Sequence, residues 1–239
     1  MGLAIALRLA KDGANVVVGA RSAGDKDYVR RTLDADHIHA AALDVQSRES
    51  VDAFVANVGE RHGAVDILVN AAGVYDEAAI IDHSEQIWED HINTNLSGTF
   101  RMIRAVMPHM ERKKWGRIVN IASVAAHQGM PNNAAYCASK AGLLGLGRCV
   151  SLEGAAHGIT CVSISPTWVE TEMLRRFIDA DMKTTGRSLD DVRAEYAKSN
   201  PQNQLVQPTE VAELAAFLVS DAARALTMED FQVNAGSLW

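Results

Sequence analysis

Short apolar segments alternate along the chain with longer segments in which apolar residues recur at helical spacing. The short segments are rich in Val and Ile, which is typical of strands buried on both faces of a parallel sheet. Strands are predicted at residues 15–19, 37–43, 65–70, 117–122, 160–165 and 231–233. Helices are predicted at residues 2–12, 25–33, 47–62, 87–110 and 209–219, with a further one that contains Tyr136 and ends near His157. The alternation predicts an α/β fold, a single Rossmann-like domain with a doubly wound parallel sheet.

One domain is expected over residues 1–239, because the chain contains no repeat, low-complexity tract or linker. The segment 171–207 is charged, contains Gly186 and Pro201, and lacks a clear strand. We interpret it as a lid that caps a substrate. The alternative is a solvated excursion without a function.

Candidate chemistry lies around Tyr136 and Lys140, which are one turn apart on a predicted helix. A unit charge about 4 Å away, at an effective dielectric of about 20, supplies ~4 kcal/mol. That is enough to bring the pKa of a tyrosine from ~10 to about 7. Ser123 follows the strand at 117–122, at the end of a strand where open α/β sheets bind ligands. A Tyr-x-x-x-Lys pair is common by chance, but with this serine it indicates a proton-transfer site.

Composition narrows the class of protein. The net charge of −7 argues against a nucleic-acid partner or an anionic membrane surface. No apolar run approaches the ~20 residues that span a bilayer. The three cysteines, Cys137, Cys149 and Cys161, show no C-x-x-C spacing, which favours free thiols in a reducing compartment. A cytoplasmic protein is expected.

The sequence resembles the classical short-chain dehydrogenase/reductase family over its whole length. The resemblance rests on the order and spacing of short motifs rather than on any one of them. The motifs are Asp44-Val45, Asn70-Ala71-Ala72-Gly73, Asn95-Leu96-Ser97-Gly98, Ser123, Tyr136-x-x-x-Lys140, and Pro166 with Val169 and Thr171.

The resemblance implies a catalytic role for four residues. Tyr136 would exchange a proton with the substrate oxygen. Lys140 would lower the pKa of that tyrosine and hold the nicotinamide ribose. Ser123 would hydrogen-bond the substrate carbonyl, and Asn95 would fix a water in a proton relay.

It also implies a dinucleotide cofactor. Asp44 and Val45 would contact the adenine, Asn70, Ala71 and Gly73 would line the cofactor, and Val169 and Thr171 would meet the nicotinamide carboxamide. NAD-preferring members usually carry an acid just after the second strand of the fold, where this chain has Ala20 and Arg21. A guanidinium suits a 2′-phosphate, so NADP(H) is favoured over NAD(H). The alternative is an exposed arginine that starts a loop.

Substrate contacts are less sharply indicated. His127 and Gln128 follow Ser123 in a loop that lines the substrate pocket in the family. Trp168 stands near a position where the family usually has Pro-Gly, and it either walls the pocket or packs in the core. His37 and His39 share a strand face, but without a third ligand no metal is expected.

The chain departs from the family at its start. Members begin with a strand and a Thr-Gly-x-x-x-Gly-x-Gly loop, and Gly2 matches the last glycine of that loop. We therefore expect two strand edges to be left unpaired inside the sheet. Either the sequence lacks the residues before this glycine, or the protein has lost dinucleotide binding.

The function expected is interconversion of a secondary alcohol and a ketone with NAD(P)(H), on a 3-oxoacyl or hydroxyacyl compound, polyol or related carbonyl. The alternative is a catalytically silent, oligomerising module of the same fold. A sugar-nucleotide epimerase is disfavoured, because such enzymes usually need a longer region after Pro166. The helices around Asn95 and Tyr136 carry the faces that build tetramers in similar proteins. A homotetramer is therefore expected, with a homodimer next.

Overall fold

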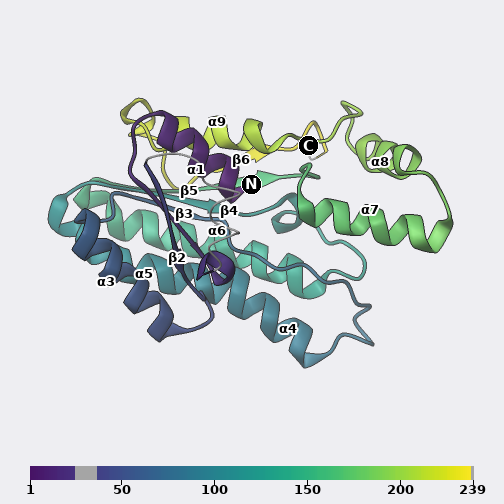
Figure 1. Ribbon diagram of the computed structural model, residues 1–239, viewed down its shortest axis with the longest axis horizontal. Helices are drawn as coiled ribbons and strands as arrows, with labels where there is room; N and C mark the ends of the chain where they lie inside the picture. Colours follow the sequence, from purple (N-terminus) through teal and green to yellow (C-terminus); the bar gives the residue numbers. More distant parts are fainter. Residues whose placement is uncertain (25–36, 238–239) are drawn as a thin grey trace.

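The computed structural model describes residues 1–24 and 37–237, and its parallel strands have helices on both faces (Figure 1). The strands are β1 (Val16–Ala20), β2 (Ile38–Ala42), β3 (Ile67–Asn70), β4 (Gly116–Ile121), β5 (Ile159–Pro166) and β6 (Asp230–Val233). The helices are α1 (Gly2–Lys11), α3 (Arg48–His62), α4 (Glu85–His91), α5 (Gly98–Lys113), α6 (Ala134–Gly154), α7 (Glu172–Thr185), α8 (Leu189–Lys198) and α9 (Pro208–Leu218). The doubly wound α/β prediction is confirmed, while the helix predicted at 25–33 lies outside the described residues.

Alternation along β4 divides the core between the two faces of the sheet. Val119 and Ile121 pack with α1 and α9 on one face. Ile118 packs with α3 and α5 on the other. All three side chains are nearly inaccessible to solvent, as expected for a central parallel strand. The sheet thereby holds the carboxyl end of β4, where Ser123 follows, in a fixed position.

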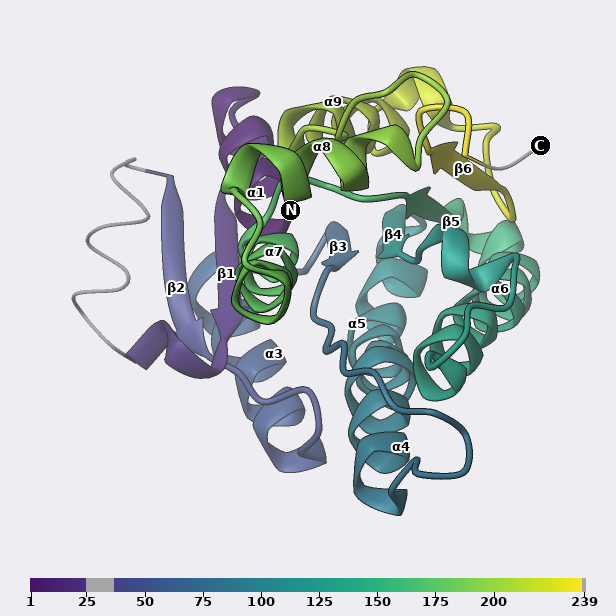
Figure 2. The same cartoon turned by 90° about the vertical axis from the view of Figure 1, so that its right-hand side faces the viewer.

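The strands form two sheets rather than one. β1 pairs with β2, and the other sheet has the order β3-β4-β5-β6. Figure 2 shows β1 and β3 separated by a gap, and both strands line one cavity of about 820 Å³. Within the described parts of the chain, no strand pairs with the facing edges of β1 and β3. The two unpaired edges expected from the sequence therefore lie across this cavity.

The predicted helix at 87–110 is not continuous. α4 and α5 are joined by a π-helical segment, Ile92–Ser97, which contains Asn95. A π-helical turn adds a residue to the α-helical repeat, and such turns are frequent at functional sites. Gly98 begins α5 at a point where a Cβ would lie 2.7 Å from Cγ2 of Val45. The glycine therefore allows α5 to approach the loop after β2.

The segment 171–207 folds into α7 and α8 around a small apolar cluster of its own. Leu174 and Ile178 of α7 pack there with Val192 of α8 and with Leu205. The Thr171 side chain caps α7 by accepting a hydrogen bond from the Leu174 N–H. The segment is thus a folded substructure that follows β5, and its role as a lid stays a prediction.

Candidate active site

Tyr136, Ser123 and Lys140 come together at the carboxyl end of β4. Tyr136 lies in the first turn of α6, and Lys140 follows one turn later with its Nζ 5.7 Å from the centre of the tyrosine ring. The Lys140 ammonium donates a 2.7 Å hydrogen bond to the carbonyl of Ile121, the last residue of β4. The Ser123 hydroxyl is hydrogen-bonded to the Tyr136 phenol. A buried serine, a buried ammonium and a partly buried phenol therefore share one site.

The pKa values of Tyr136 and Lys140 are both shifted by burial. Burial raises the pKa of the Tyr136 phenol, and the hydrogen bond with Ser123 only partly opposes that effect. Burial also lowers the pKa of the Lys140 ammonium, to about 8. The pKa of Tyr136 is therefore raised where the sequence led us to expect a lowered value, and the role of Lys140 in lowering it stays a prediction.

Asn95 lies behind this site, fully buried in the π-helical turn. Its Oδ1 accepts the Val74 N–H at 2.8 Å, and its Nδ2 donates to the Val74 carbonyl at 3.1 Å. The same Nδ2 donates to Ser139 Oγ at 3.0 Å, and that hydroxyl donates to the Tyr136 carbonyl at 2.8 Å. Asn95 thus ties the loop after β3 to the helix that carries Tyr136.

The lining of the large cavity comes near this cluster at Gly73. A Cβ at Gly73 would lie 3.3 Å from Asn95 Oδ1, a tight contact, and 3.8 Å from Lys140 Nζ, so the glycine backbone passes close to both side chains. The cavity is lined by most of the residues expected at a dinucleotide, namely Arg21, Asp44, Val45, Asn70, Ala71, Ala72 and Gly73. The lining residues at the carboxyl ends of the strands, from Arg21 to Gly73, suit a dinucleotide, whereas the apolar part of the cavity lies between the unpaired edges of β1 and β3.

Comparisons with known proteins agree with this geometry. A family model described as enoyl-(acyl carrier protein) reductase matches residues 1–237. A 3-oxoacyl-[acyl-carrier-protein] reductase FabG from Staphylococcus epidermidis is 33% identical over 239 residues, covering 99% of this chain and 93% of the relative. A D-beta-hydroxybutyrate dehydrogenase from Rhizobium meliloti is 36% identical over 242 residues, covering 99% and 93%.

The chain belongs to the short-chain dehydrogenase/reductase family. It is accordingly an NAD(P)-dependent oxidoreductase that acts on a secondary alcohol or ketone. An actinorhodin polyketide ketoreductase solved with NADPH superimposes with a TM-score of 0.92 at 36% identity, covering 99% of this chain and 92% of that one. A second structure, ElxO with NADP bound, shares the fold with a TM-score of 0.90 at 23% identity, covering 99% and 93%.

Val169 and Thr171, the two residues expected to contact the nicotinamide of this short-chain dehydrogenase/reductase, stabilise the backbone between β5 and α7. Val169 is buried and forms a bridge with Val206 where the chain leaves β5. The Thr171 hydroxyl caps α7 and also donates a 3.2 Å hydrogen bond to the Val169 carbonyl. Neither residue lines the large cavity. Their contact with a cofactor stays a prediction.

The three residues expected to contact the substrate, His127, Gln128 and Trp168, have different surroundings in the structure. His127 does not face Tyr136: its Nε2 lies 2.7 Å from an Asp230 carboxylate oxygen, and it lines a separate cavity of about 210 Å³ beside α6, β5 and β6. Gln128 is exposed next to it. Trp168 stacks edge-on against Tyr196 of α8, with ring centres 4.9 Å apart. The structure therefore favours packing for Trp168 and gives His127 a partner on β6.

Several residues that shape the site carry no signal in the sequence. Tyr75 packs directly on Tyr136, and Phe177 of α7 packs on Tyr75. Ser139 and His91 are buried hydrogen-bonding links beside them. They come from the loop after β3, from α4, α6 and α7, so no motif spacing could have grouped them. Only the register of the π-helical segment and the path of α7 bring them together.

Two negative findings apply to residues 1–24 and 37–237. None of the helices there is long and apolar enough to cross a membrane. No group of three or more His, Cys, Asp or Glu side chains in those ranges is arranged to hold a metal ion. His39, one of the two histidines weighed as ligands, instead stacks on His62 with ring centres 5.0 Å apart.

Proposed function

We propose that this enzyme reduces a ketone, or oxidises the matching secondary alcohol, with Tyr136 as the proton-transferring group. The single observation that carries the proposal is the cluster of phenol, Ser123 hydroxyl and buried Lys140 ammonium, which lies next to Gly73 in the lining of the large cavity. A raised phenol pKa keeps Tyr136 protonated at neutral pH, which suits it to give a proton to a ketone oxygen.

In the reducing direction the substrate oxygen lies between Ser123 and Tyr136. Ser123 donates a hydrogen bond to that oxygen and stabilises the charge that develops on it. Tyr136 gives up its phenolic proton, and the Lys140 ammonium then lowers the energy of the phenolate. Asn95 holds the loop and the helix that position these groups. When bound, the nicotinamide supplies or accepts the hydride.

The cofactor would be held by the residues of the large cavity. Arg21 follows β1 at the cavity wall, and a guanidinium there matches a 2′-phosphate. Asp44 and Val45 would lie against the adenine, and the bare backbone at Gly73 would admit the nicotinamide ribose next to Lys140. Val169 and Thr171 would meet the carboxamide. NADP(H) is therefore proposed over NAD(H), in line with the two structural neighbours solved with NADPH or NADP.

The substrate class proposed is a 3-oxoacyl or 3-hydroxyacyl compound. Relatives named as 3-oxoacyl and ketoacyl reductases and a hydroxybutyrate dehydrogenase support a carbonyl next to an acyl group. The segment 171–207 would cap this substrate, because Phe177 of α7 reaches the aromatic ring that covers Tyr136. An assay should include an enoyl thioester, since the family model is described as an enoyl reductase.

A homotetramer in the cytoplasm is proposed as the working form. Phe100 of α5 and Leu152 of α6 are apolar side chains with 45% and 68% exposure on the two helices expected to form the interface. The three cysteines are free thiols, as expected in a reducing compartment. Light scattering of Phe100→Glu and Leu152→Glu variants tests the interface, because a charge in its centre would reduce the mass.

The decisive experiment is a fluorescence titration with NADPH and with NADH, followed by an assay with a 3-oxoacyl thioester. Arg21→Ala should weaken NADPH binding by about tenfold or more and leave NADH binding unchanged. Arg48→Ala is the matched control, because Arg48 lies on α3 outside the cavity lining and is paired with Asp52. Equal weakening of both nucleotides would reject the 2′-phosphate role.

Failure to bind either nucleotide has its own follow-up. A variant that carries an apolar strand and a glycine-rich loop before Gly2 should then bind, because the cavity wall would be complete. Absence of binding and of ketone reduction in that variant as well would reject the proposed function.

A further inference from the structure

Tyr75 lies between the site and α7. Its ring meets the Tyr136 ring edge to face, with centres 4.6 Å apart at 81°. On its other side it meets Phe177 of α7 in the same manner, with centres 4.8 Å apart at 87°. The three rings form a column that begins on α6, passes through the loop after β3, and ends on α7. Such edge-to-face pairs have a preferred geometry, so each ring restricts the orientation of the next.

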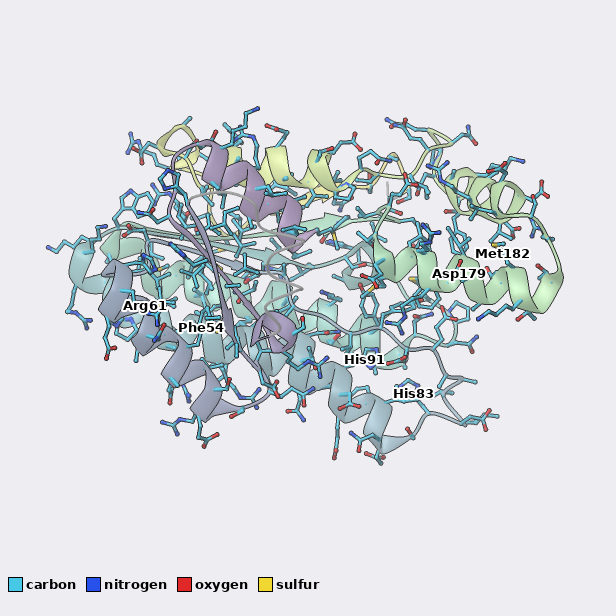
Figure 3. All side chains as sticks on the ribbon, in the orientation of Figure 1. Phe54, Arg61, His83, His91, Asp179 and Met182 are labelled. Atoms are coloured by element: carbon cyan, nitrogen blue, oxygen red, sulfur yellow. The ribbon has the colours of Figure 1, made fainter. Side chains whose placement is uncertain are left out.

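The backbone on both sides of Tyr75 is held by buried side chains. Asn95 forms two hydrogen bonds with the peptide groups of Val74. His91 Nε2 accepts the Asp76 N–H at 3.1 Å, while its Nδ1–H donates to the Ile87 carbonyl at 2.7 Å. Both side chains are fully buried, and Figure 3 marks His91 at the end of α4, where the π-helical turn begins. The loop is therefore clamped at residues 74 and 76, and Tyr75 has little freedom to leave Tyr136.

The hydroxyl of Tyr75 is also fixed. It donates a 2.6 Å hydrogen bond to Glu77 Oε1. Burial and the nearby carboxylate raise the pKa of this phenol, so it stays protonated and is a poor proton donor to a substrate. The hydrogen bond instead fixes the direction of the ring, whose side chain is only 7% exposed.

We propose that Tyr75 is a positioning residue for Tyr136 and that Phe177 of α7 acts on Tyr136 through Tyr75. The ring of Tyr75 holds the reacting phenol toward Ser123 and excludes water from it. Phe177 supports that ring, so the seating of α7 over the site controls how dry the phenol is. The inference deepens the proposed function, because it rests on Tyr136 as the proton-transferring group.

Substitution of Tyr75 or Phe177 leaves the other polar side chains around Tyr136 in place. They are Ser123 after β4, Lys140 and Cys137 on α6, and His91 on α4. A change in the ionisation of Tyr136 after substitution of Tyr75 or Phe177 therefore reports the loss of the ring column.

The experiment uses protein labelled with ¹³C at Cζ of its four tyrosines. The chemical shift of that carbon reports the ionised fraction of each phenol, and Tyr136→Phe assigns the signal. Near pH 10 an ordinary tyrosine is about half ionised, whereas Tyr136 should remain mostly protonated. Tyr75→Leu and Phe177→Leu should each increase its ionised fraction, because water gains access to the phenol. Tyr75→Phe keeps the ring and should leave the Tyr136 signal as in the parent protein.

A double-variant cycle tests the order of action. The Tyr75→Leu/Phe177→Leu protein should match Tyr75→Leu alone, since Phe177 acts through Tyr75. Phe217→Leu on α9 is the control, an exposed aromatic outside the column. Circular dichroism confirms folding, and if Tyr75→Leu does not fold, Phe177→Leu against Phe217→Leu still decides the question. An unchanged Tyr136 signal in folded Tyr75→Leu, or in Phe177→Leu where Tyr75→Leu does not fold, would overturn the inference.

Kinetics separate this inference from the function on which it rests. Tyr75→Leu should lower kcat for ketone reduction about tenfold, with little change in KM for the nucleotide and a shift in the alkaline limb of the pH profile. Loss of activity in Tyr136→Phe together with unchanged kcat and pH profile in Tyr75→Leu would reject only the positioning role. Full activity in Tyr136→Phe would reject the proposed function, while the ¹³C signals would still show whether the ring column exists.

Discussion

The Lys140 ammonium is buried beside a phenol whose pKa is itself raised by burial. The two groups therefore share a cost of desolvation that a charge-to-charge argument from the sequence leaves out. In a buried pair the cationic form of the lysine and the anionic form of the tyrosine are each disfavoured until the other is present. Tyr136 therefore remains protonated and uncharged until it transfers its proton.

Removal of the phenolic hydroxyl should abolish most of the activity. Tyr136→Phe is expected to lower kcat for ketone reduction by about 10²–10⁴-fold, the usual contribution of general acid catalysis. Nucleotide binding should change less than about twofold, because the ring remains in place. Steady-state kinetics and fluorescence titration measure the two effects. A variant that lost both equally would show that Tyr136 mainly holds the cofactor.

The lowered pKa of Lys140 makes stability depend on pH. The pKa is about 8 in the folded protein against an ordinary 10.5, so between these values the unfolded chain binds more protons. Stability contributed through this group must therefore rise as the pH increases from about 8 toward 10.5. We expect the unfolding free energy of the parent protein, minus that of Lys140→Met, to increase by about 3 kcal/mol at most.

Urea denaturation of the two proteins at pH 7, 9 and 10.5 measures this difference. Other titrating groups are present in both proteins and cancel in the comparison. A difference that stayed constant, or fell, with rising pH would show that the ammonium has a more favourable environment than its burial indicates. Ketone reduction should also decline as the pH rises through about 8, since the cation that supports the phenolate is lost.

At the level of elements, the π-helical segment and the start of α5 set the position of Asn95 and of the loop after β2. Gly98 is the critical position, because a Cβ would meet Val45, which lines the large cavity. Arg101 of α5 also donates a 3.1 Å hydrogen bond to the Val45 carbonyl. α5 and the loop after β2 are therefore held together by an apolar contact at Gly98 and by a hydrogen bond from Arg101.

Gly98→Ala should reduce stability by about 1–3 kcal/mol, the usual cost of overpacking. Nucleotide affinity should fall as well, because Val45 is displaced. Gly145→Ala in α6 is the matched control: no atom lies within 4 Å of a Cβ there, and a gain of about 0.5–1 kcal/mol is expected from helix propensity. Thermal unfolding and NADPH titration test both variants. Equal behaviour of the two would contradict the close contact.

At the scale of the molecule, β1 and β3 face each other across a gap, and their facing edges have no strand partner among the residues that the structure describes. Both edges are parallel strand edges, and the cavity between them is lined on its inner part by apolar residues such as Val17 and Leu68. An extended apolar strand running parallel to both would pair its N–H and C=O groups on each side. It would also bury side chains against both layers of helices.

Addition of such a strand should stabilise the protein. A five-residue Val/Ile strand with a short glycine loop before Gly2 is expected to add at least about 3 kcal/mol, the burial of two such side chains. NADPH binding should tighten at the same time. The control is the same extension with a proline at the central strand position, which cannot complete the pairing. Similar denaturation midpoints for both extensions would show that the gap does not accept a strand.

The local pattern along the chain was sufficient for much of this description. Near-continuous apolar strands, helical spacing and the positions of Ser123, Tyr136 and Lys140 determined the α/β class and three residues of the site, because the carboxyl ends of parallel strands meet at one edge. The residues of the motif Asn70-Ala71-Ala72-Gly73, which were expected at a cofactor, line the large cavity, and their contact with a cofactor stays a prediction. These residues could be located from the sequence because any parallel sheet brings the ends of its strands to one edge.

Tertiary structure alone decided the rest. Burial of Tyr136 and Lys140 set the direction of their pKa changes, and burial is a property of everything packed around them. His127 turned to Asp230 of β6, a partner over a hundred residues away in the sequence. Tyr75 contacts Tyr136, and Phe177 contacts Tyr75, because a π-helical turn and the path of α7 bring these rings together. Such contacts depend on how distant elements pack, and no local spacing encodes that.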